Sequence, residues 1–277
     1  MLNRWLFVGV IAGSVGCGGT HSEGKMQPAS LPAQPSGSAG AETIIEPEAD
    51  DALRRMSAYL GGLKSFRVDA MTTDEFVTTE GQKIQFVKET RVAVVRPDKL
   101  RADRIGPMGR AVLRYDGKQI SFHGPELNIY AVEAAPADLT SMMDFAHDRL
   151  GIDAPAGDLL VPNSYQELMD GVGVGRYIGR EQMGDFQVHH LAMTQKDVDW
   201  QLWIKDGAEP VPVRYVITTK TMAQQPQFTA ELRNWRPNEP VHDEEFTFQP
   251  PAEAKRMTFD EIQKMKREVR GNVLKTE

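Results

Sequence analysis

The sequence lacks the motifs that most often reveal a chemical activity. Its 277 residues include a single cysteine, Cys17, so no internal disulfide can form. No His-Glu-x-x-His, Cys-x-x-Cys or Gly-x-Ser-x-Gly motif occurs, which removes the commonest zinc and serine-hydrolase signals. We therefore predict a protein that is not an enzyme and carries no cofactor and no metal. A hydrolase that uses polar residues inside its fold is the less favoured alternative.

Clusters of positive charge are missing as well. The net charge is −7 with a pI near 5.5, and no run of Lys and Arg with interleaved aromatic residues occurs. These are the features of a nucleic-acid groove, so we predict that the chain does not bind nucleic acid. The composition, with 40% hydrophobic and 26% charged residues, is typical of a globular protein with one sizeable core.

After residue 16 the sequence has no apolar run long enough to cross a bilayer. Before it, Arg4 precedes the apolar run Trp5 to Ile11, a pattern typical of an export signal. The signal ends in Ser-Val-Gly-Cys17, which resembles the bacterial lipobox, although Ser14 stands where an aliphatic residue is usual. We predict a signal peptide at 1–16 and a lipid anchor on Cys17. The alternative is an ordinary secretory signal with an incidental cysteine.

The stretch after the cysteine is rich in Gly, Pro, Ser, Ala and Gln and contains almost no large apolar residues. Such a composition cannot support a core, so residues 17–45 are predicted to be a flexible tether. Gly18 follows Cys17, whereas the inner-membrane retention signal of enteric bacteria has aspartate there. We expect the protein at the periplasmic face of the outer membrane, with a soluble periplasmic or secreted protein as the alternative.

Periodicity predicts the fold of the rest. Apolar residues at steps of three and four predict a helix at Pro47–Leu63, and alternation predicts a hairpin of strands at 66–79 and 82–95. Further strands are predicted at 99–105, 111–115, 118–122, 128–132, 175–183, 186–194, 227–235 and 245–248, with a hairpin at 197–219. A helix is predicted at 136–150. Capping boxes at Ser164–Glu167 and Thr258–Glu261 mark the starts of a second short helix and of a last helix.

This order of elements predicts an α+β fold: a large curved antiparallel sheet, an unclosed half-barrel, with helices covering its concave face. We place this domain at 46–257, followed by a peripheral C-terminal helix and tail at 258–277. A curled sheet with helices in its mouth encloses an apolar cavity unless aromatic side chains fill it.

The stretch 197–219 is the most informative part of the sheet. Its alternation places Trp200 on one face and Trp203 on the other, with a turn at Asp206-Gly207. One tryptophan is expected in the core and the other under a further element or a ligand. From this hairpin and the methionines of the helix at 136–150, we predict the wall of a binding cavity. Its residues are Trp200, Leu202, Ile204, Val213, Tyr215, Met142 and Met143; core filling is the commoner role of such methionines.

The histidines give weak signals. His189 and His190 are adjacent on a strand and point to opposite faces, so they cannot easily share one metal ion. Asp144 and His147 lie on one face of a predicted helix, where a local polar contact is a simpler interpretation than a metal site.

Several short motifs together give the sequence a family resemblance from about residue 50 to 257. It resembles an uncharacterised bacterial family of predicted periplasmic proteins, which is similar to the LolA and LolB lipoprotein carriers. The motifs are Ala52–Ser57, Arg96-Pro97-Asp98, Tyr115–Lys118, Asn128–Tyr130, Gly175–Gly179, His190–Ala192, Asp199–Ile204, Pro212 and Phe246–Pro251.

The resemblance implies an unclosed barrel with a helical lid over a hydrophobic cavity, and for function it gives only an analogy. The expected partner is a lipid or an acylated protein, held without a covalent step by an envelope lipoprotein that is itself anchored to the membrane through Cys17. The alternative is a scaffold or sensor that packs its cavity shut and binds another envelope protein.

Overall fold

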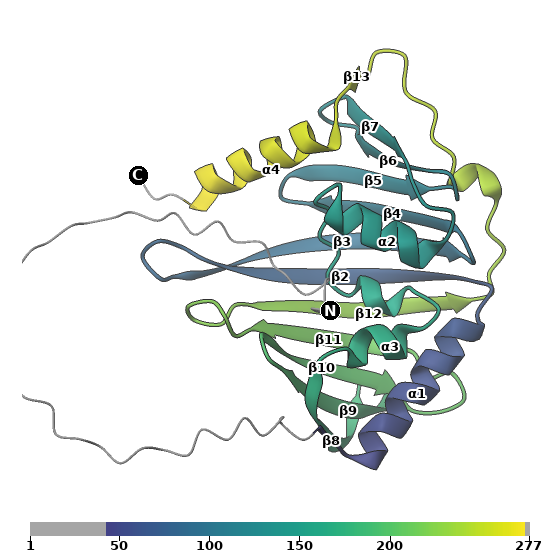
Figure 1. Cartoon of the computed structure of the whole chain (residues 1–277), viewed down its shortest axis with the longest axis vertical. Coiled ribbons are helices and arrows are strands. Elements are labelled where there is room, and N and C mark those ends of the chain that lie inside the picture. The colour runs from purple at the N-terminus through teal and green to yellow at the C-terminus, as the bar shows by residue number, and fades with distance from the viewer. Residues whose placement is uncertain (1–42, 275–277) are drawn as a thin grey trace, which may run out of the picture.

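The computed structural model describes residues 43–274, so the predicted export signal, Cys17 and nearly all of the tether lie outside the described residues. A single large sheet organises the described part (Figure 1). The strand order is β1-β8-β9-β10-β11-β12-β2-β3-β4-β5-β6-β7-β13. The strands are β1 (Ile44–Ile45), β2 (Ser65–Val77), β3 (Lys83–Val95), β4 (Lys99–Gly106), β5 (Gly109–Tyr115), β6 (Gln119–Gly124), β7 (Ile129–Ala134), β8 (Val172–Met183), β9 (Phe186–Gln195), β10 (Val198–Lys205), β11 (Pro212–Thr219), β12 (Gln227–Pro237) and β13 (Lys255–Arg256).

The predicted antiparallel sheet is confirmed from β8 through to β7. Two short parallel strands extend it at its edges, because β1 pairs with β8 and β13 pairs with β7 in parallel. These two edges are not joined within the described residues, so the sheet stays open and does not close into a barrel. The fold class is α+β with a mixed sheet, close to the predicted half-barrel.

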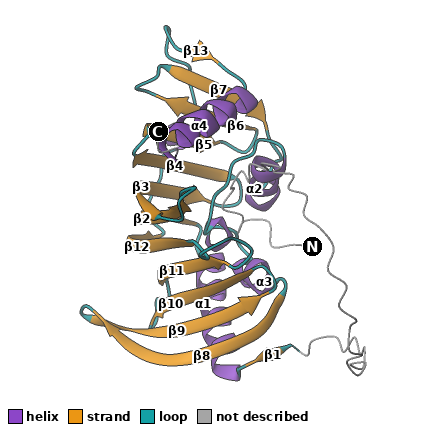
Figure 2. Ribbon diagram, turned by 90° about the vertical axis from the view of Figure 1, so that its left-hand side faces the viewer, coloured by secondary structure: helices purple, strands orange, loops and turns teal. Residues whose placement is uncertain are grey.

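Four helices accompany the sheet: α1 (Pro47–Gly62), α2 (Leu139–Asp148), α3 (Ser164–Met169) and α4 (Phe259–Leu274). The first three lie on one side of the sheet, as Figure 2 shows. Helix α1 begins with proline at its first turn and buries the stripe of Leu53, Met56 and Leu60. No helix among residues 43–274 is long and apolar enough to cross a membrane.

The two faces of the sheet differ in chemistry because side chains alternate along each strand. The face under the helices carries the main hydrophobic cluster, to which every one of the first three helices contributes. The other face carries ion pairs, including those of Arg67 with Glu239 and Glu245. Phe246 is buried outside the main cluster, in a stretch between β12 and β13 that follows the strand ends (Figure 1).

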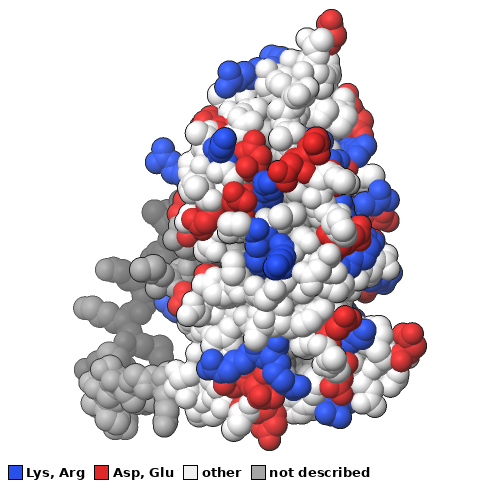
Figure 3. Space-filling model, turned by 90° about the vertical axis from the view of Figure 1, so that its right-hand side faces the viewer, with Lys and Arg blue, Asp and Glu red and all other residues white. Residues whose placement is uncertain are grey.

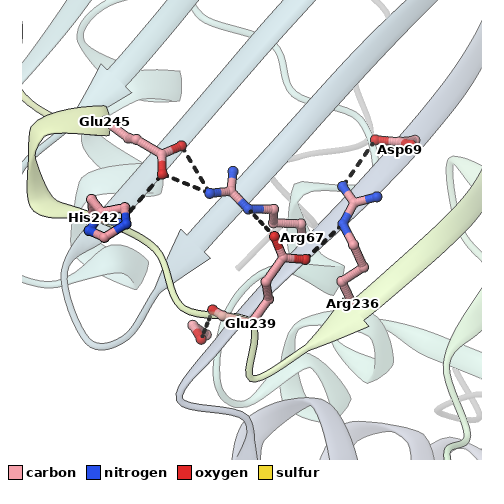
Figure 4. Close-up of polar contacts among 7 residues, drawn as sticks. Arg67, Asp69, Arg236, Glu239, His242 and Glu245 are labelled. Carbon is pink, nitrogen blue, oxygen red and sulfur yellow. Dashed lines mark hydrogen bonds and ion pairs between the residues drawn. The ribbon is translucent and has the colours of Figure 1, made fainter.

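Charged residues fix this stretch to the sheet (Figure 4). Arg67 of β2 donates a hydrogen bond to Glu245 at 2.7 Å, and its Nε lies 3.2 Å from Glu239. Arg236 of β12 pairs with the same Glu239 at 3.0 Å. The guanidinium of Arg67 lowers the pKa of Glu245. Because the pairs form a network and Arg67 is mostly buried, they anchor the stretch more firmly than isolated surface pairs would.

Three predictions about local structure are wrong. The predicted strand at 245–248 is absent, because Asp243–Glu245 forms a short 3-10 turn (η2) in its place. Ser164 does not cap α3; the cap is Asn163, and the Ser164 hydroxyl bonds to Ser57 instead. The C-terminal helix is not peripheral at its start, since Phe259 and Ile262 are buried.

The other capping box is confirmed. Glu261 accepts a hydrogen bond from the Thr258 backbone at 2.7 Å, and Thr258 accepts one from the Glu261 backbone at 3.2 Å. This reciprocal pair sets the start of α4 on the sheet.

Charges on the surface are mixed in sign. On the face shown in Figure 3, Lys and Arg lie beside Asp and Glu with uncharged surface between them, and no broad basic area forms.

Candidate functional site beneath the helices

The floor of the candidate site is built by β10 and β11. Trp200, Leu202 and Ile204 of β10 are each at most 1% exposed, and Tyr215 of β11 is fully buried opposite Leu202. All four belong to the main hydrophobic cluster on the helix-covered face. The alternation in the sequence thus predicts the inward face of this hairpin correctly.

Trp203 lies on the opposite face, as predicted. Its ring stacks on His190 at 4.1 Å between centroids, and its indole Nε1 donates to Glu181 at 3.0 Å. The Arg214 guanidinium lies 5.3 Å from the same ring. The covering for this second tryptophan therefore comes from neighbouring strands.

Val213 has a different position from the other predicted wall residues. The register steps from Trp203 opposite Arg214 to Ile204 opposite Pro212, so Val213 is the extra residue of a β-bulge. It is buried, but it lies outside the main hydrophobic cluster. A bulge at this point follows from the proline, which cannot donate to the ladder.

The roof of the site comes from α1, α2, α3 and the segment between the last two. Met142 and Met143 of α2 are buried in the same cluster as the floor residues. We call residues 151–163 the cap segment. It contains a short 3-10 turn, η1 (Gly157–Leu159), whose Leu159 is buried in the cluster. The predicted wall and roof residues therefore share one continuous hydrophobic layer, but α2 with its two methionines lies over β3 and β4 and not over β10 and β11 (Figure 1).

A buried carboxyl group interrupts this apolar layer. Asp158 of the cap segment is 1% exposed, and its Oδ2 accepts a long hydrogen bond of 3.4 Å from the Tyr215 hydroxyl. Its Oδ1 has no hydrogen-bond partner. Burial raises the pKa of Asp158 to about 7, because the charged form loses its hydration. Burial also raises the pKa of Tyr215 well above its usual value.

A second unpaired polar atom belongs to the side chain whose ring packs on the same tyrosine. The Trp200 ring meets the Tyr215 ring edge to face at 5.8 Å, and the buried Trp200 Nε1 has no hydrogen-bond partner. Buried polar groups are nearly always paired, so two such atoms around one side chain are unusual. Sequence reasoning missed Asp158, although an acid directly before the apolar Leu-Leu-Val run at 159–161 is a signal that could have found it.

Arg96 lies at the end of β3 beside the roof. Its Nη2 donates to the Leu60 carbonyl at 3.3 Å, while Nε and Nη1 are buried without a partner. Within the described residues no carboxylate forms an ion pair with it. Burial lowers its pKa to about 10, so the guanidinium keeps its charge at neutral pH.

Polar contacts join two of the covering helices to each other. The Ser57 hydroxyl of α1 accepts from the Tyr165 backbone of α3 at 2.9 Å, and Ser57 and Ser164 hydroxyls lie 3.1 Å apart. Arg54 donates to the Tyr165 hydroxyl at 2.6 Å and covers its ring. The side chains that α1 turns to the sheet are apolar instead. Helices α1 and α3 thus form one unit whose buried side chains meet the sheet through hydrophobic contacts, with hydrogen bonds to the sheet at the helix ends, such as that from the Tyr177 backbone to Glu46 at 2.7 Å.

This unit gives a prediction with a matched control. A Cβ at Gly61 would lie 2.5 Å from the Pro162 carbonyl oxygen, whereas a Cβ at Gly62 meets nothing within 4 Å. Gly61→Ala is therefore expected to destabilise the protein by about 1–3 kcal/mol through overpacking. Gly62→Ala is expected to be neutral or to stabilise by up to about 1 kcal/mol, because alanine favours the helix. Urea unfolding measures both; equal effects would contradict the close contact of α1 with the cap segment.

The histidines lie apart from this site. His190 bonds to Glu181 at 2.6 Å and to Gln201 at 3.0 Å, while His189 bonds to Tyr177 at 2.8 Å and to Asp206 at 3.0 Å. Their different partners confirm that they face opposite sides. His147 pairs with Asp153 at 3.4 Å. Among residues 43–274 no group of three or more His, Cys, Asp or Glu side chains could hold a metal ion.

Fold and site define a class of protein: an open, strongly curved sheet whose apolar face lies beneath a helical lid. The chain belongs to the family of predicted periplasmic proteins called DUF2092, whose model matches residues 49–260. This confirms the family resemblance of the motifs and supports a protein exported to the periplasm. A comparison with curated proteins gives no match.

The chain also shows a distant similarity to several solved structures. The lipoprotein LppX of Mycobacterium tuberculosis is 17% identical with a TM-score of 0.45, covering 71% of this chain and 98% of its own. LprF of Mycobacterium bovis is 14% identical with a TM-score of 0.42, covering 76% and 99%. A LolA superfamily protein of Nitrosomonas europaea is 12% identical with a TM-score of 0.38, covering 72% and 97%. Similarity at this distance carries no argument about a ligand.

Proposed function

We propose that this protein is a non-catalytic envelope lipoprotein that binds a hydrophobic ligand, an acyl chain, a lipid or an acylated protein, between its sheet and its helical lid. The observation that carries the proposal is the division of contacts in the lid. Helices α1 and α3 make side-chain polar contacts to each other and face the floor of the site with apolar side chains, while their polar contacts to the sheet lie at the helix ends.

An interface of this kind suits reversible opening. An acyl chain that enters replaces apolar contacts by apolar contacts, and each methylene group taken out of water contributes about 0.8 kcal/mol. The lid moves as a unit because its own hydrogen bonds stay intact. Predicted wall residues such as Trp200, Leu202 and Tyr215, together with Met142 and Met143, then contact the chain in the open state.

Native mass spectrometry tests the proposal. The full chain with Cys17→Ser, which cannot carry its own acyl group, is purified from the cell envelope and its bound molecules are extracted. A fatty acid, phospholipid or acylated peptide in stoichiometric amount is the expected result. A protein that is empty and also excludes an added hydrophobic fluorescent probe would contradict it.

A second function is favoured by one observation: the floor residues and the roof methionines are all buried within one continuous hydrophobic layer. A closed core fits a scaffold or sensor that binds another envelope protein. Its surface would be the outer sheet face around Trp203. Trp203→Ala would then abolish crosslinking to that protein, whereas a ligand carrier would keep its bound lipid in this variant.

The lipid anchor is a separate proposal, since Cys17 lies outside the described residues. A signal peptide at 1–16 and a tether at 17–45 would hold the domain at the periplasmic face of the outer membrane. Cys17→Ser is expected to abolish incorporation of an alkyne-labelled palmitate and to move the protein from the membrane fraction to the soluble periplasm. A Ser14→Leu variant, which brings the lipobox closer to its usual form, serves as the matched control and should keep the label. Label that persists in Cys17→Ser would rule the anchor out.

A further inference from the structure

The two unpaired atoms around Tyr215 differ in their hydrogen-bonding character. Trp200 Nε1 can only donate, and Asp158 Oδ1 accepts when ionised or takes part as a hydroxyl when protonated. Both belong to side chains that are 1% exposed, on the floor and in the cap segment respectively. Leaving such a group unpaired costs roughly 1–3 kcal/mol.

The backbone beside Asp158 is also unusual. Ala156 adopts φ 68°, a left-handed conformation that is unfavourable for alanine. It directly precedes the turn that points the carboxyl group at Tyr215. Backbone strain of this kind persists only where the surrounding structure holds the residue in place, and it is commonest at ligand-binding and active sites.

The geometry points to a polar subsite, formed by Asp158, Tyr215 and Trp200, for an uncharged hydroxyl- or amide-bearing head group at the end of the ligand's hydrocarbon chain. This inference rests on the proposed function and names the class of ligand. A glycerol ester head can donate to Asp158 and accept from Trp200, so both unpaired atoms gain partners.

An anionic head group is disfavoured at this subsite. A carboxylate or phosphate would lie beside Asp158 with no cation among its hydrogen-bond partners, and repulsion between like charges is strong in a buried site. Among the described residues, Arg96, which directly follows β3, is a buried cation without an ion pair, but β12 and β2 lie between β3 and β11 in the sheet. Three strand spacings of about 4.8 Å separate the two, so one small head group cannot reach both.

Competition binding separates the two classes of head group. The full chain with Cys17→Ser is loaded with the apolar fluorescent probe N-phenyl-1-naphthylamine at pH 8, and the probe is displaced with 1-monomyristoylglycerol or with myristate. The two competitors have the same acyl chain and differ in head-group charge. Monomyristoylglycerol is expected to displace the probe at about tenfold lower concentration than myristate. Its head group gains hydrogen bonds to Asp158 and Trp200, whereas the carboxylate of myristate is repelled by Asp158.

Single substitutions test which residue causes the preference for the uncharged competitor. Asp158→Leu is expected to reduce it to below about threefold, because the polar partner is lost. Asp158→Asn keeps a hydrogen-bonding group but removes the charge that repels myristate, so it should also reduce the preference to below about threefold while displacement by monomyristoylglycerol stays unchanged; this covers the case in which the leucine variant does not fold. Asp153→Leu, an exposed aspartate of the same cap segment, should leave it unchanged.

The outcomes distinguish the inference from the function on which it rests. Probe binding with equal displacement by both competitors overturns the uncharged subsite and leaves the hydrophobic site standing. Stronger displacement by myristate that is lost in Arg96→Gln overturns it in favour of an anion at the roof. A chain that binds no probe at all overturns both.

Discussion

Replacing Asp158 by asparagine is expected to remove a pH dependence of on the order of 3 kcal/mol in the free energy of unfolding between pH 5 and pH 8. The folded-state pKa of Asp158 is about 7, against an ordinary value of 3.8. As the pH rises from about 4 to 7, the unfolded chain releases this proton and the folded chain keeps it. The unfolded state therefore binds fewer protons, and stability falls through this window.

The measurement compares urea unfolding of the wild type and the variant at pH 5, 6, 7 and 8. The difference between the two chains isolates Asp158 from the paired carboxylates, such as Glu245, whose lowered pKa values act in the opposite direction. Asp185→Asn, at an exposed turn between β8 and β9, is the control and should follow the wild type. A constant difference between wild type and Asp158→Asn across this range would show that the carboxyl group is ionised or hydrated in the folded protein.

Replacing Trp200 by alanine is expected to destabilise the protein by about 3–5 kcal/mol, the usual cost of deleting a fully buried aromatic side chain. Trp200 is 1% exposed and packs against Tyr215 in the main cluster. Trp203 is only three residues away but lies on the outer face, where it keeps the contacts of one stacked histidine and one arginine. Trp203→Ala is expected to cost about 1 kcal/mol.

The pair of variants tests the face assignment of the whole hairpin. Both changes remove the same side chain from the same strand, so propensity and unfolded-state effects are similar and the difference reports packing. Chemical denaturation of the two variants under identical conditions gives this difference. Equal losses would mean that the outer face at β10 is covered as fully as the floor.

Much of the fold is determined by the sequence itself. The apolar steps of three and four in α1, the long alternation of β2 and β3 and the turn between Lys205 and Pro212 are local patterns, and each element forms close to where its pattern predicts it. Alternation also determines that Trp200 and Trp203 lie on opposite faces, because side chains an odd number of positions apart on a strand point to opposite faces of the sheet.

Other features were decided only by tertiary structure. The alternation of Phe246 and Phe248 mimics a strand, yet Arg67 and the sheet surface hold this stretch as a turn and an irregular segment. Ser164 has the pattern of a helix cap, but its proximity to Ser57 of a helix more than a hundred residues earlier gives its hydroxyl a different partner. Local propensity yields in both places to contacts that no local pattern encodes.

The candidate site divides in the same way. The sequence alone determined the apolar floor, because alternating Trp200, Leu202 and Ile204 can serve only a buried face. Only the tertiary structure placed Asp158 of the cap segment against Tyr215, two residues separated by 57 positions in the chain. Periodicity reports which face of one element is buried, whereas a polar subsite arises where side chains of different elements meet, and that meeting depends on the packing of the whole lid against the sheet.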